Sequence, residues 1–168
     1  MAAFNKELKQ TNLFYEDFVT IQQIDLSNVS LCLGEGAPLK LFTKYLKSNE
    51  KIKAFIFFDK LTKEACGYYW LFFKGAHEWE YTICGNGESA LISSVYVFEK
   101  WRGKRLMQIM IEHAFQICRR EGIKYIYASV RKNNASAWKA YNRVGYELIE
   151  NRQFIRFLAY FVPIQHIP

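Results

Sequence analysis

A strand pattern that leads into a long helical pattern constrains this chain more than any other feature. Residues Leu91 to Phe98 are mostly apolar or β-branched, which is typical of a buried strand. A short charged turn from Glu99 to Lys104 follows, and apolar residues then recur at helical spacing from Leu106 to Ile117. The first N–H groups of a helix have no intrahelical partner, so a basic, glycine-containing turn that opens a helix predicts an anion site.

The next segments extend this unit. Residues Ile123 to Val130 are predicted to form a strand, and Gly122 suits the end of the helix before it. A strand–helix–strand unit of about 40 residues is expected to make a right-handed parallel crossover. Asn133 or Asn134 then caps another helix, which ends before Gly145.

The remaining segments predict a mixed α/β domain with antiparallel strands before the crossover. Before the hairpin we expect a short helix over Met1 to Gln10, a strand over Phe14 to Ile24, a loop over Asp25 to Pro38 and a helix from Leu39 to Ser48. We then expect a hairpin of Lys51 to Lys60 and Ala65 to Lys74, followed by an extra strand and glycine turn over Gly75 to Ser89. At the end of the chain we expect a closing hairpin of Tyr146 to Glu150 and Gln153 to Phe161, and a loose tail over Pro163 to Pro168.

Length and composition favour one globular domain, residues 1–168, in the cytoplasm. The chain has 168 residues, of which 51% are hydrophobic. No apolar run approaches the ~18 residues of a membrane span, so no membrane partner is expected. The first ten residues lack the apolar core of a secretory signal. The four cysteines show no C-x-x-C spacing, which favours buried thiols in a reducing cytosol over disulfides or zinc.

The formal net charge of +7 favours an anionic partner. The candidates are a phosphorylated cofactor, an anionic substrate, nucleic acid and a membrane surface, and the alternative is an ordinary basic surface. The basic residues are dispersed and no nucleic-acid recognition motif is present, so we expect no nucleic-acid partner. A basic, aromatic-bearing nucleic-acid binder stays as a third interpretation of the function.

Two segments together resemble the GNAT superfamily of N-acetyltransferases. The first, V-Y-V-F-E-K-W-R-G-K-R-L-M from Val95 to Met107, lies where that family keeps a strand ending in R/Q-x-x-G-x-G/A. The second, V-R-K-N-N-A-S-A-W-K-A-Y-N-R-V-G-Y, is similar to the family's N-x-x-A-x-x-x-Y-x-x-x-G-F/Y from Asn134 to Tyr146. Arg105 and Met107 depart from the first motif, because the family usually has small residues there.

The resemblance, which is specific over residues 91–150, implies a GNAT-like mixed fold. Its features are a mostly antiparallel sheet of six to seven strands, helices on both faces and a central β-α-β unit that binds acyl-CoA. It also implies acetyl-CoA as co-substrate, with the pantetheine arm along one strand and the pyrophosphate on main-chain N–H groups. The implied cofactor-binding residues are Val95, Tyr96, Val97, Arg102, Gly103, Lys104, Arg105, Leu106, Met107, Gln108, Asn134 and Tyr141.

Tyr141 is the expected catalytic residue. It lies seven residues after Asn134, so both side chains leave the helix in the same direction, ~10 Å apart. A phenol that ionises near pH ~10 can donate a proton to a departing thiolate. The alternative is a core tyrosine with a satisfied hydroxyl.

Glu80 is the expected general base, although it, Glu88 and His77 also suit a solvated surface. No Ser-His-Asp or Cys-His pattern is readable, which favours direct transfer over an acyl-enzyme. His77, His113 and His166 lack metal-ligand spacing, so no metal is expected, and His113 is expected on a helix surface.

Two functions on this fold stay open. The first is an N-acetyltransferase whose acceptor is a small-molecule amine, such as an amino sugar, an amino acid or a polyamine, or otherwise a protein amine. The second is a catalytically silent module that senses acyl-CoA or contacts a partner, for which the Arg105 and Met107 substitutions are the best support. Homodimer formation is left open.

Overall fold

The computed structural model describes residues 2–7, 18–32, 39–48, 51–76, 87–151, 154–157 and 160–163. In chain order its elements are β1 (Ala2–Glu7), β2 (Val19–Gln23), the 3-10 turn η1 (Val29–Leu31), α1 (Leu39–Ser48), β3 (Ile52–Asp59), β4 (Ala65–Phe72), β5 (Ser89–Val97), the 3-10 turn η2 (Glu99–Trp101), α3 (Leu106–Arg120), β6 (Tyr125–Val130), α4 (Ala135–Arg143), β7 (Glu147–Asn151), β8 (Phe154–Phe157) and β9 (Tyr160–Pro163).

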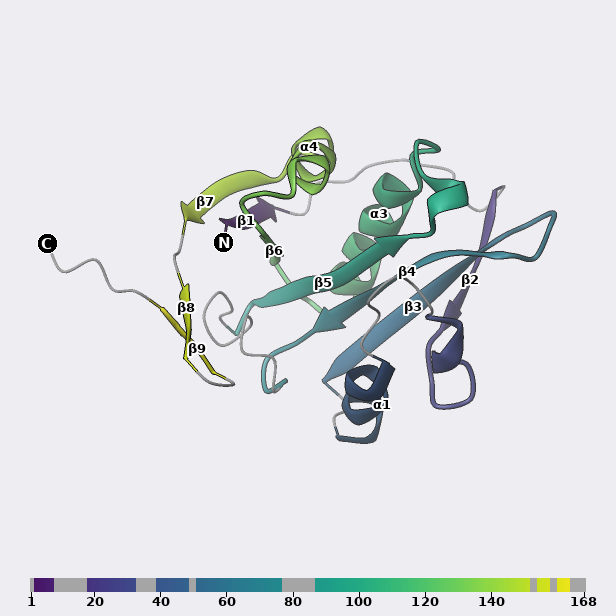
Figure 1. Ribbon diagram of the computed structural model, residues 1–168, viewed down its shortest axis with the longest axis horizontal. Coiled ribbons are helices and arrows are strands. Elements are labelled where there is room, and N and C mark those ends of the chain that lie inside the picture. The colour runs from purple at the N-terminus through teal and green to yellow at the C-terminus, as the bar shows by residue number, and fades with distance from the viewer. Residues whose placement is uncertain are drawn as a thin grey trace, which may run out of the picture.

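One mixed sheet holds most of the described strands, in the order β2-β3-β4-β5-β6-β1-β7 (Figure 1). All of its neighbouring pairs are antiparallel except β5 and β6, which run parallel and are joined through α3. The predicted mixed α/β class, with a mostly antiparallel sheet and a central β-α-β crossover, is therefore confirmed.

Helices cover both faces of the sheet, as Figure 1 shows with α3 and α1 on opposite sides. One buried cluster places Met110 and Phe115 of α3 against Tyr69 of β4 and Ile92 of β5. The other places Phe42 of α1 against β4, where its ring stacks on Trp70 with ring centroids 4.5 Å apart. Residues of β4 point alternately into the two clusters and are buried from Cys66 to Phe72, which explains the nearly continuous apolar sequence of this strand.

The predicted N-terminal helix is wrong. Residues Ala2 to Glu7 form β1, which lies between β6 and β7 and pairs antiparallel with both. Six residues with little apolar periodicity carry no strong local signal, and two strands with free edges supply the hydrogen-bond partners that decide the outcome.

The predicted closing hairpin is also wrong. β7 pairs with β1 on one edge and is the last strand of the sheet, and the segment after it does not pair with its other edge in the described residues. Instead β8 pairs antiparallel with β9 in a separate two-stranded sheet. Pro163 ends β9, and residues 164–168 lie outside the described residues, as do 77–86 of the predicted extra strand.

His113 is half-buried against the sheet, not on the helix surface as expected. Its Nδ1 atom lies 2.6 Å from the Tyr69 hydroxyl oxygen, and its ring meets the Phe55 ring edge-on with centroids 4.7 Å apart. Burial, with a smaller contribution from the positive charge of Arg120, lowers the pKa of His113 to about 4.

This pKa predicts a loss of stability in acid. The unfolded chain binds a proton at His113 near pH ~6.5, whereas the folded protein resists it until about pH 4. Stability is therefore complete above pH ~6.5 and is lost as the pH falls towards 4, by at most roughly 2 kcal/mol at pH ~5. Urea denaturation at pH 7 and 5 measures the change, and His113→Gln is the comparison. An equal pH dependence in both proteins would contradict the assignment to His113.

Candidate functional site

The parallel strands β5 and β6 separate part-way along their length. Their register runs from Ser89 opposite Tyr125 to Ile92 opposite Ala128 and stops there. Beyond Ile92, β5 continues to Val97 and pairs only with β4, while the end of β6 pairs only with β1. One edge of β5 is thus left without a strand partner in the described structure, beside the start of α3.

A bulge interrupts β5 at the beginning of this free edge. Trp70 of β4 lies opposite Ser93, and Tyr68 lies opposite Tyr96, so two residues of β5 face one of β4. Ser94 has a positive φ of 49°. After the bulge, Val95 and Val97 pack toward the α3 cluster, and Tyr96 packs toward the other cluster.

The turn between η2 and α3 presents a run of free donors. The N–H groups of Trp101 and Arg102 donate to carbonyls of the turn, and that of Gln108 donates to the Arg105 oxygen at 3.0 Å. Between them, no main-chain N–H from Gly103 to Met107 donates to another described residue. Five consecutive free donors at the positive end of a helix form a cradle for an anion. The Gln108 N–H, the last main-chain donor that we expect at the pyrophosphate, donates to the Arg105 oxygen in this structure.

Two residues at this turn depart from the family motif. Arg105 is exposed and is the N-cap residue of α3, with a left-handed φ of 60°. Met107 is half-buried and packs against the core. A Cβ added at Gly103, where φ is 78°, would meet no atom within 4 Å. Arg105 thus holds a left-handed conformation that glycine would adopt without strain.

We expect Arg105→Gly to raise the free energy of unfolding by up to about 1 kcal/mol. An L-residue in the left-handed region carries a steric cost of roughly 1–2 kcal/mol. Glycine removes this cost, but it loses more conformational entropy on folding, which offsets part of the gain. The neighbouring Lys104 has no positive φ, so Lys104→Gly relieves no strain. It should lower the free energy of unfolding by about 0.5–1 kcal/mol. Thermal unfolding of the two variants measures both values, and a stability loss in Arg105→Gly would contradict the strain.

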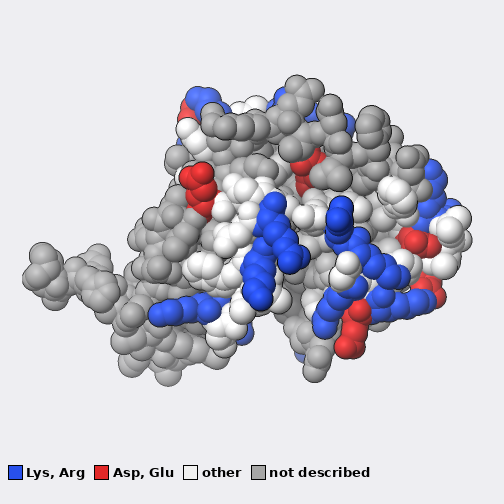
Figure 2. Space-filling view, turned by 90° about the horizontal axis from the view of Figure 1, so that it is seen from above, with Lys and Arg blue, Asp and Glu red and all other residues white. Residues whose placement is uncertain are grey.

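Basic side chains surround the turn. Figure 2 shows Lys and Arg gathered on the face that carries α4 and the start of α3. The Lys104 Nζ atom lies 4.4 Å from the centre of the Trp101 ring. Arg102 turns back onto β5, where its Nε donates to the Val97 carbonyl at 3.3 Å and its guanidinium lies 5.9 Å from the Tyr96 ring centre. Arg102 thus braces the turn against the free edge of β5.

The second motif forms α4 and the residues after it. The Asn134 Oδ1 atom accepts from the Ala137 N–H at 3.1 Å and caps the helix, so only its amide nitrogen is left for a cofactor. Tyr141 is 4% exposed and its ring lies 4.9 Å from that of Tyr146. The structure therefore places Tyr141 inside the core cluster that also holds β5.

Glu80, the expected base, and His77 lie outside the described residues. Glu88 is exposed in the turn before β5, and its Oε1 accepts from the Lys124 Nζ at 2.6 Å. Among the described residues no group of three His, Cys, Asp or Glu side chains could hold a metal ion. None of the described helices has the length and apolar character that a bilayer span requires.

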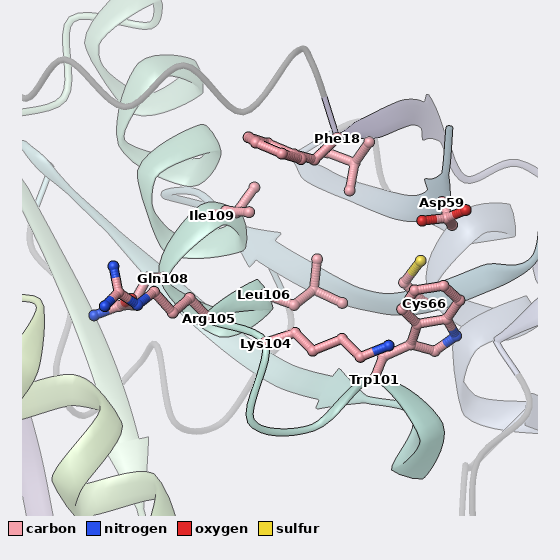
Figure 3. Close-up of a pocket in the computed structure, with 10 residues that line it drawn as sticks. Phe18, Asp59, Cys66, Trp101, Lys104, Arg105, Leu106, Gln108 and Ile109 are labelled. Atoms are coloured by element: carbon pink, nitrogen blue, oxygen red, sulfur yellow. The ribbon is translucent and has the colours of Figure 1, made fainter. Parts of the chain in front are cut away.

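Sequence reasoning missed a cavity of about 430 Å³ beside the start of α3. Figure 3 shows its walls, which come from β2, β3, β4, η2, the turn before α3 and α3 itself. Half of its lining residues lie in the first motif or directly after it, namely Trp101, Lys104, Arg105, Leu106 and Gln108. The motif did not reveal the cavity, because the opposite wall comes from strands that are distant in the sequence.

The comparison with family models decides the family. The model of the acetyltransferase (GNAT) family matches residues 20–146. The chain belongs to the GNAT acetyltransferase family. This confirms the resemblance that was carried by residues 91–150, and it extends the match upstream to β2, where the sequence offered only the order of elements.

Solved GNAT structures share the fold. The aminoglycoside N-acetyltransferase AAC(6')-Iy, in complex with CoA, is 14% identical and superposes with a TM-score of 0.66, covering 84% of this chain and 95% of that one. Ribosomal-protein-alanine N-acetyltransferase from Brucella melitensis biovar Abortus 2308 is 15% identical with a TM-score of 0.64, covering 83% and 99%. An IAA acetyltransferase from Bacillus cereus ATCC 14579 is 16% identical with a TM-score of 0.60, covering 83% of each chain. A comparison with curated proteins finds no match.

Proposed function

We propose that this GNAT family member is an acetyl-CoA-dependent N-acetyltransferase that acetylates a primary amine by direct transfer. The observation that carries the proposal is the edge of β5 beyond Ile92, which has no strand partner among the described residues. It leads to the main-chain N–H groups of Gly103 to Met107, which donate to no described residue. An extended, amide-bearing arm that ends in a diphosphate has the shape and chemistry for such a surface.

The residues at this surface suit coenzyme A. Main-chain groups of Val95 to Val97 bind the pantetheine arm as an added strand would, and the donors from Gly103 to Met107 bind the pyrophosphate. Lys104 and Arg105 add positive charge near the phosphates. Arg102 holds the turn in place through its bond to the Val97 carbonyl. The Gln108 N–H is the last main-chain donor proposed for the pyrophosphate, and the Asn134 side chain is proposed to hold the cofactor arm.

Bound acetyl-CoA supplies an acetyl group activated as a thioester. In the proposed reaction a C–N bond to the amine forms as the C–S bond breaks. A main-chain N–H on the free edge of β5 donates to the acetyl oxygen. The Tyr141 hydroxyl gives its proton to the departing sulfur. A base takes the proton from the amine, and Glu80 is proposed for this role.

The proposed acceptor is a small-molecule amine, namely an amino sugar, an amino acid or a polyamine. The AAC(6')-Iy neighbour is an aminoglycoside acetyltransferase that was also solved with a bisubstrate analogue of CoA and acetylneamine, which supports including amino sugars. We also propose a cytoplasmic location, which the buried free thiols of Cys32, Cys66 and Cys118 support. The single domain over 1–168 and the homodimer stay predictions.

Thermal unfolding with and without CoA tests cofactor binding. A ligand that binds only the folded protein stabilises it by about 2.7 kcal/mol at a concentration of 100 times Kd. We therefore expect a clear rise in Tm with CoA or acetyl-CoA. No rise at saturating concentration would remove the cofactor and with it the proposed reaction.

A free-thiol release assay over a panel of amines tests turnover. The panel holds an aminoglycoside, a polyamine, amino acids and a peptide with a free N-terminus. Release that depends on one class of amine supports the transferase and identifies its acceptor. A rise in Tm without release on any amine would favour the silent, acyl-CoA-sensing module instead.

A further inference from the structure

Strand β2 ends the sheet, and one of its edges is unpaired in the described structure. Figure 1 shows it at one end of the strand order, where β3 is its only neighbour among the described strands. The Phe18 carbonyl accepts from the Lys60 N–H at 3.0 Å. The Ile24 N–H donates to the Ala54 carbonyl at 2.8 Å. Bonding alternates along an antiparallel pair, so the even-numbered residues from 18 to 24 bond to β3 and the odd-numbered ones point their main-chain groups outward.

This edge lacks the features by which sheet edges usually avoid other strands. Such edges carry charged side chains or prolines, or a covering segment protects them. The β2 sequence V-T-I-Q-Q has no charged residue and no proline, and three of its five side chains are exposed. The Gln23 carbonyl accepts from the Asn28 Nδ2 at 3.0 Å. The outward main-chain groups of Val19 and Ile21 bond to no described residue, so they can pair with another strand.

Exposed apolar side chains stand at both ends of β2. Phe18, directly before the strand, is 66% exposed, and Leu61, which follows the Lys60 partner of Phe18, is 90% exposed. At the other end Leu26, three residues after the strand, is 52% exposed. These are three of the five large apolar side chains that are exposed among the described residues. Apolar surface that gathers in one region typically marks a protein contact.

The two ends also carry opposite charges. At the Phe18 end, Lys60 and Lys63 outnumber Asp59. At the other end stands Asp25, whose pKa is lowered mainly by a hydrogen bond from the Ser27 hydroxyl. A two-fold axis through the middle of β2 places each end beside the opposite end of a second copy. The surface is therefore complementary to itself in charge.

We propose that two copies of this chain associate by antiparallel pairing of their β2 edges about a two-fold axis at Ile21. The outward-pointing residues form the hydrogen-bonded pairs, with Ile21 opposite its own copy and Val19 opposite Gln23 of the partner subunit. Thr20 lies opposite Gln22 of the partner subunit. This second kind of pair is not hydrogen-bonded and brings its side chains close together.

The area of this contact predicts a weak dimer. Each strand edge is about 17 Å long. Together with the exposed parts of Phe18, Leu26 and Leu61 in both copies, the edges cover roughly 1,000 Å² in total. Stable interfaces usually bury about 1,200–2,000 Å², so we expect a dimer that forms at micromolar concentration and dissociates on dilution. The pairing uses no residue of the proposed acetyl-transfer site and is independent of that function.

Sedimentation equilibrium of the full chain, from about 1 to 200 μM, tests the association. We expect the average mass to rise with concentration from the monomer value of 19.9 kDa towards twice that value. A constant monomer mass up to about 200 μM would overturn the proposal.

Charged variants test the pairing and its register. Thr20→Lys with Gln22→Lys places lysines opposite lysines in the dimer, and we expect the dissociation constant to rise by about 100-fold. Thr20→Lys with Gln22→Glu places each lysine opposite a glutamate of the partner subunit and should restore association. Asn133→Lys with Asn142→Lys adds the same charge at exposed positions at and before α4 and should change little. Tm values confirm that each variant is folded.

Three outcomes would refute this interface. The first is an unchanged dimer in the variant with two lysines in β2, which would place the contact elsewhere. The second is a lysine–glutamate variant that associates no better than the one with two lysines, which would exclude the register about Ile21. The third is an equal loss in the α4 control, which would assign the effect to net charge.

Discussion

Replacing Gly67 with alanine is expected to lower the free energy of unfolding by about 3 kcal/mol or more. Gly67 lies in β4, beneath the middle of α3. A Cβ atom there would come within 2.3 Å of the Met110 Cε and 2.4 Å of the Tyr96 carbonyl oxygen. The methionine side chain can turn away, but the carbonyl belongs to the neighbouring strand. The added methyl group therefore forces β4 and β5 apart or lifts α3 from the sheet.

The matched control for this change is Gly87→Ala. A Cβ at Gly87 would lie 3.3 Å from the flexible end of Lys74, and the φ of Gly87 is not positive. We expect Gly87→Ala to lower the free energy of unfolding by less than about 0.5 kcal/mol. Gly67→Ala should lower Tm by roughly 6–12 °C. The double variant Gly67→Ala with Met110→Ala should recover little, because the contact with the Tyr96 oxygen remains. A Gly67→Ala protein as stable as Gly87→Ala would show that the Tyr96 carbonyl of β5 does not lie this close to Gly67.

Tyr141→Phe is expected to lower kcat by about 10²–10⁴-fold and to leave the Kd for CoA nearly unchanged. The substitution removes only the hydroxyl, which the proposed function uses as the proton donor to the departing sulfur, and general acid catalysis typically contributes that factor. The ring keeps its place against Tyr146. Initial rates of thiol release give kcat, and calorimetric titration with CoA gives Kd.

Tyr146→Phe separates proton donation from packing. The Tyr146 hydroxyl is buried without a hydrogen-bond partner among the described residues, and burial raises its pKa well above the usual value. Its removal should leave the rate unchanged and cost no stability, since no bond is lost. Equal rate losses in the two variants would assign the effect to packing in this aromatic pair. A normal rate in Tyr141→Phe would remove Tyr141 from the mechanism.

The parts that sequence reasoning predicted well are those that depend on neighbours along the chain. The hairpin of β3 and β4 follows from two apolar runs around a turn, and α3 follows from apolar spacing that ends at a basic turn and Gly122. Asn134 caps α4 because its side chain reaches the N–H of a residue three positions later. Such contacts close within a few residues, so local patterns are enough to indicate them.

The predictions that failed needed partners from distant parts of the chain. The six residues of β1 pair with strands that lie more than one hundred residues later, and β8 and β9 pair with each other and not with β7. His113 was expected on the surface of its helix, whereas Tyr69 and Phe55 of the sheet lie against it. Only the assembled sheet brings these groups together.

The sequence by itself determined that the chain has a strand, a basic turn and a helix that suit a phosphate-bearing cofactor, and a second motif that ends in Tyr141. Tertiary structure decided whether Arg105 and Met107 leave that turn open, because one adopts a left-handed conformation and the other packs against the core. It also decided where β5 and β6 separate, and it created the cavity between α3 and the sheet. Backbone direction and long-range packing depend on contacts between segments, and no local pattern encodes those contacts.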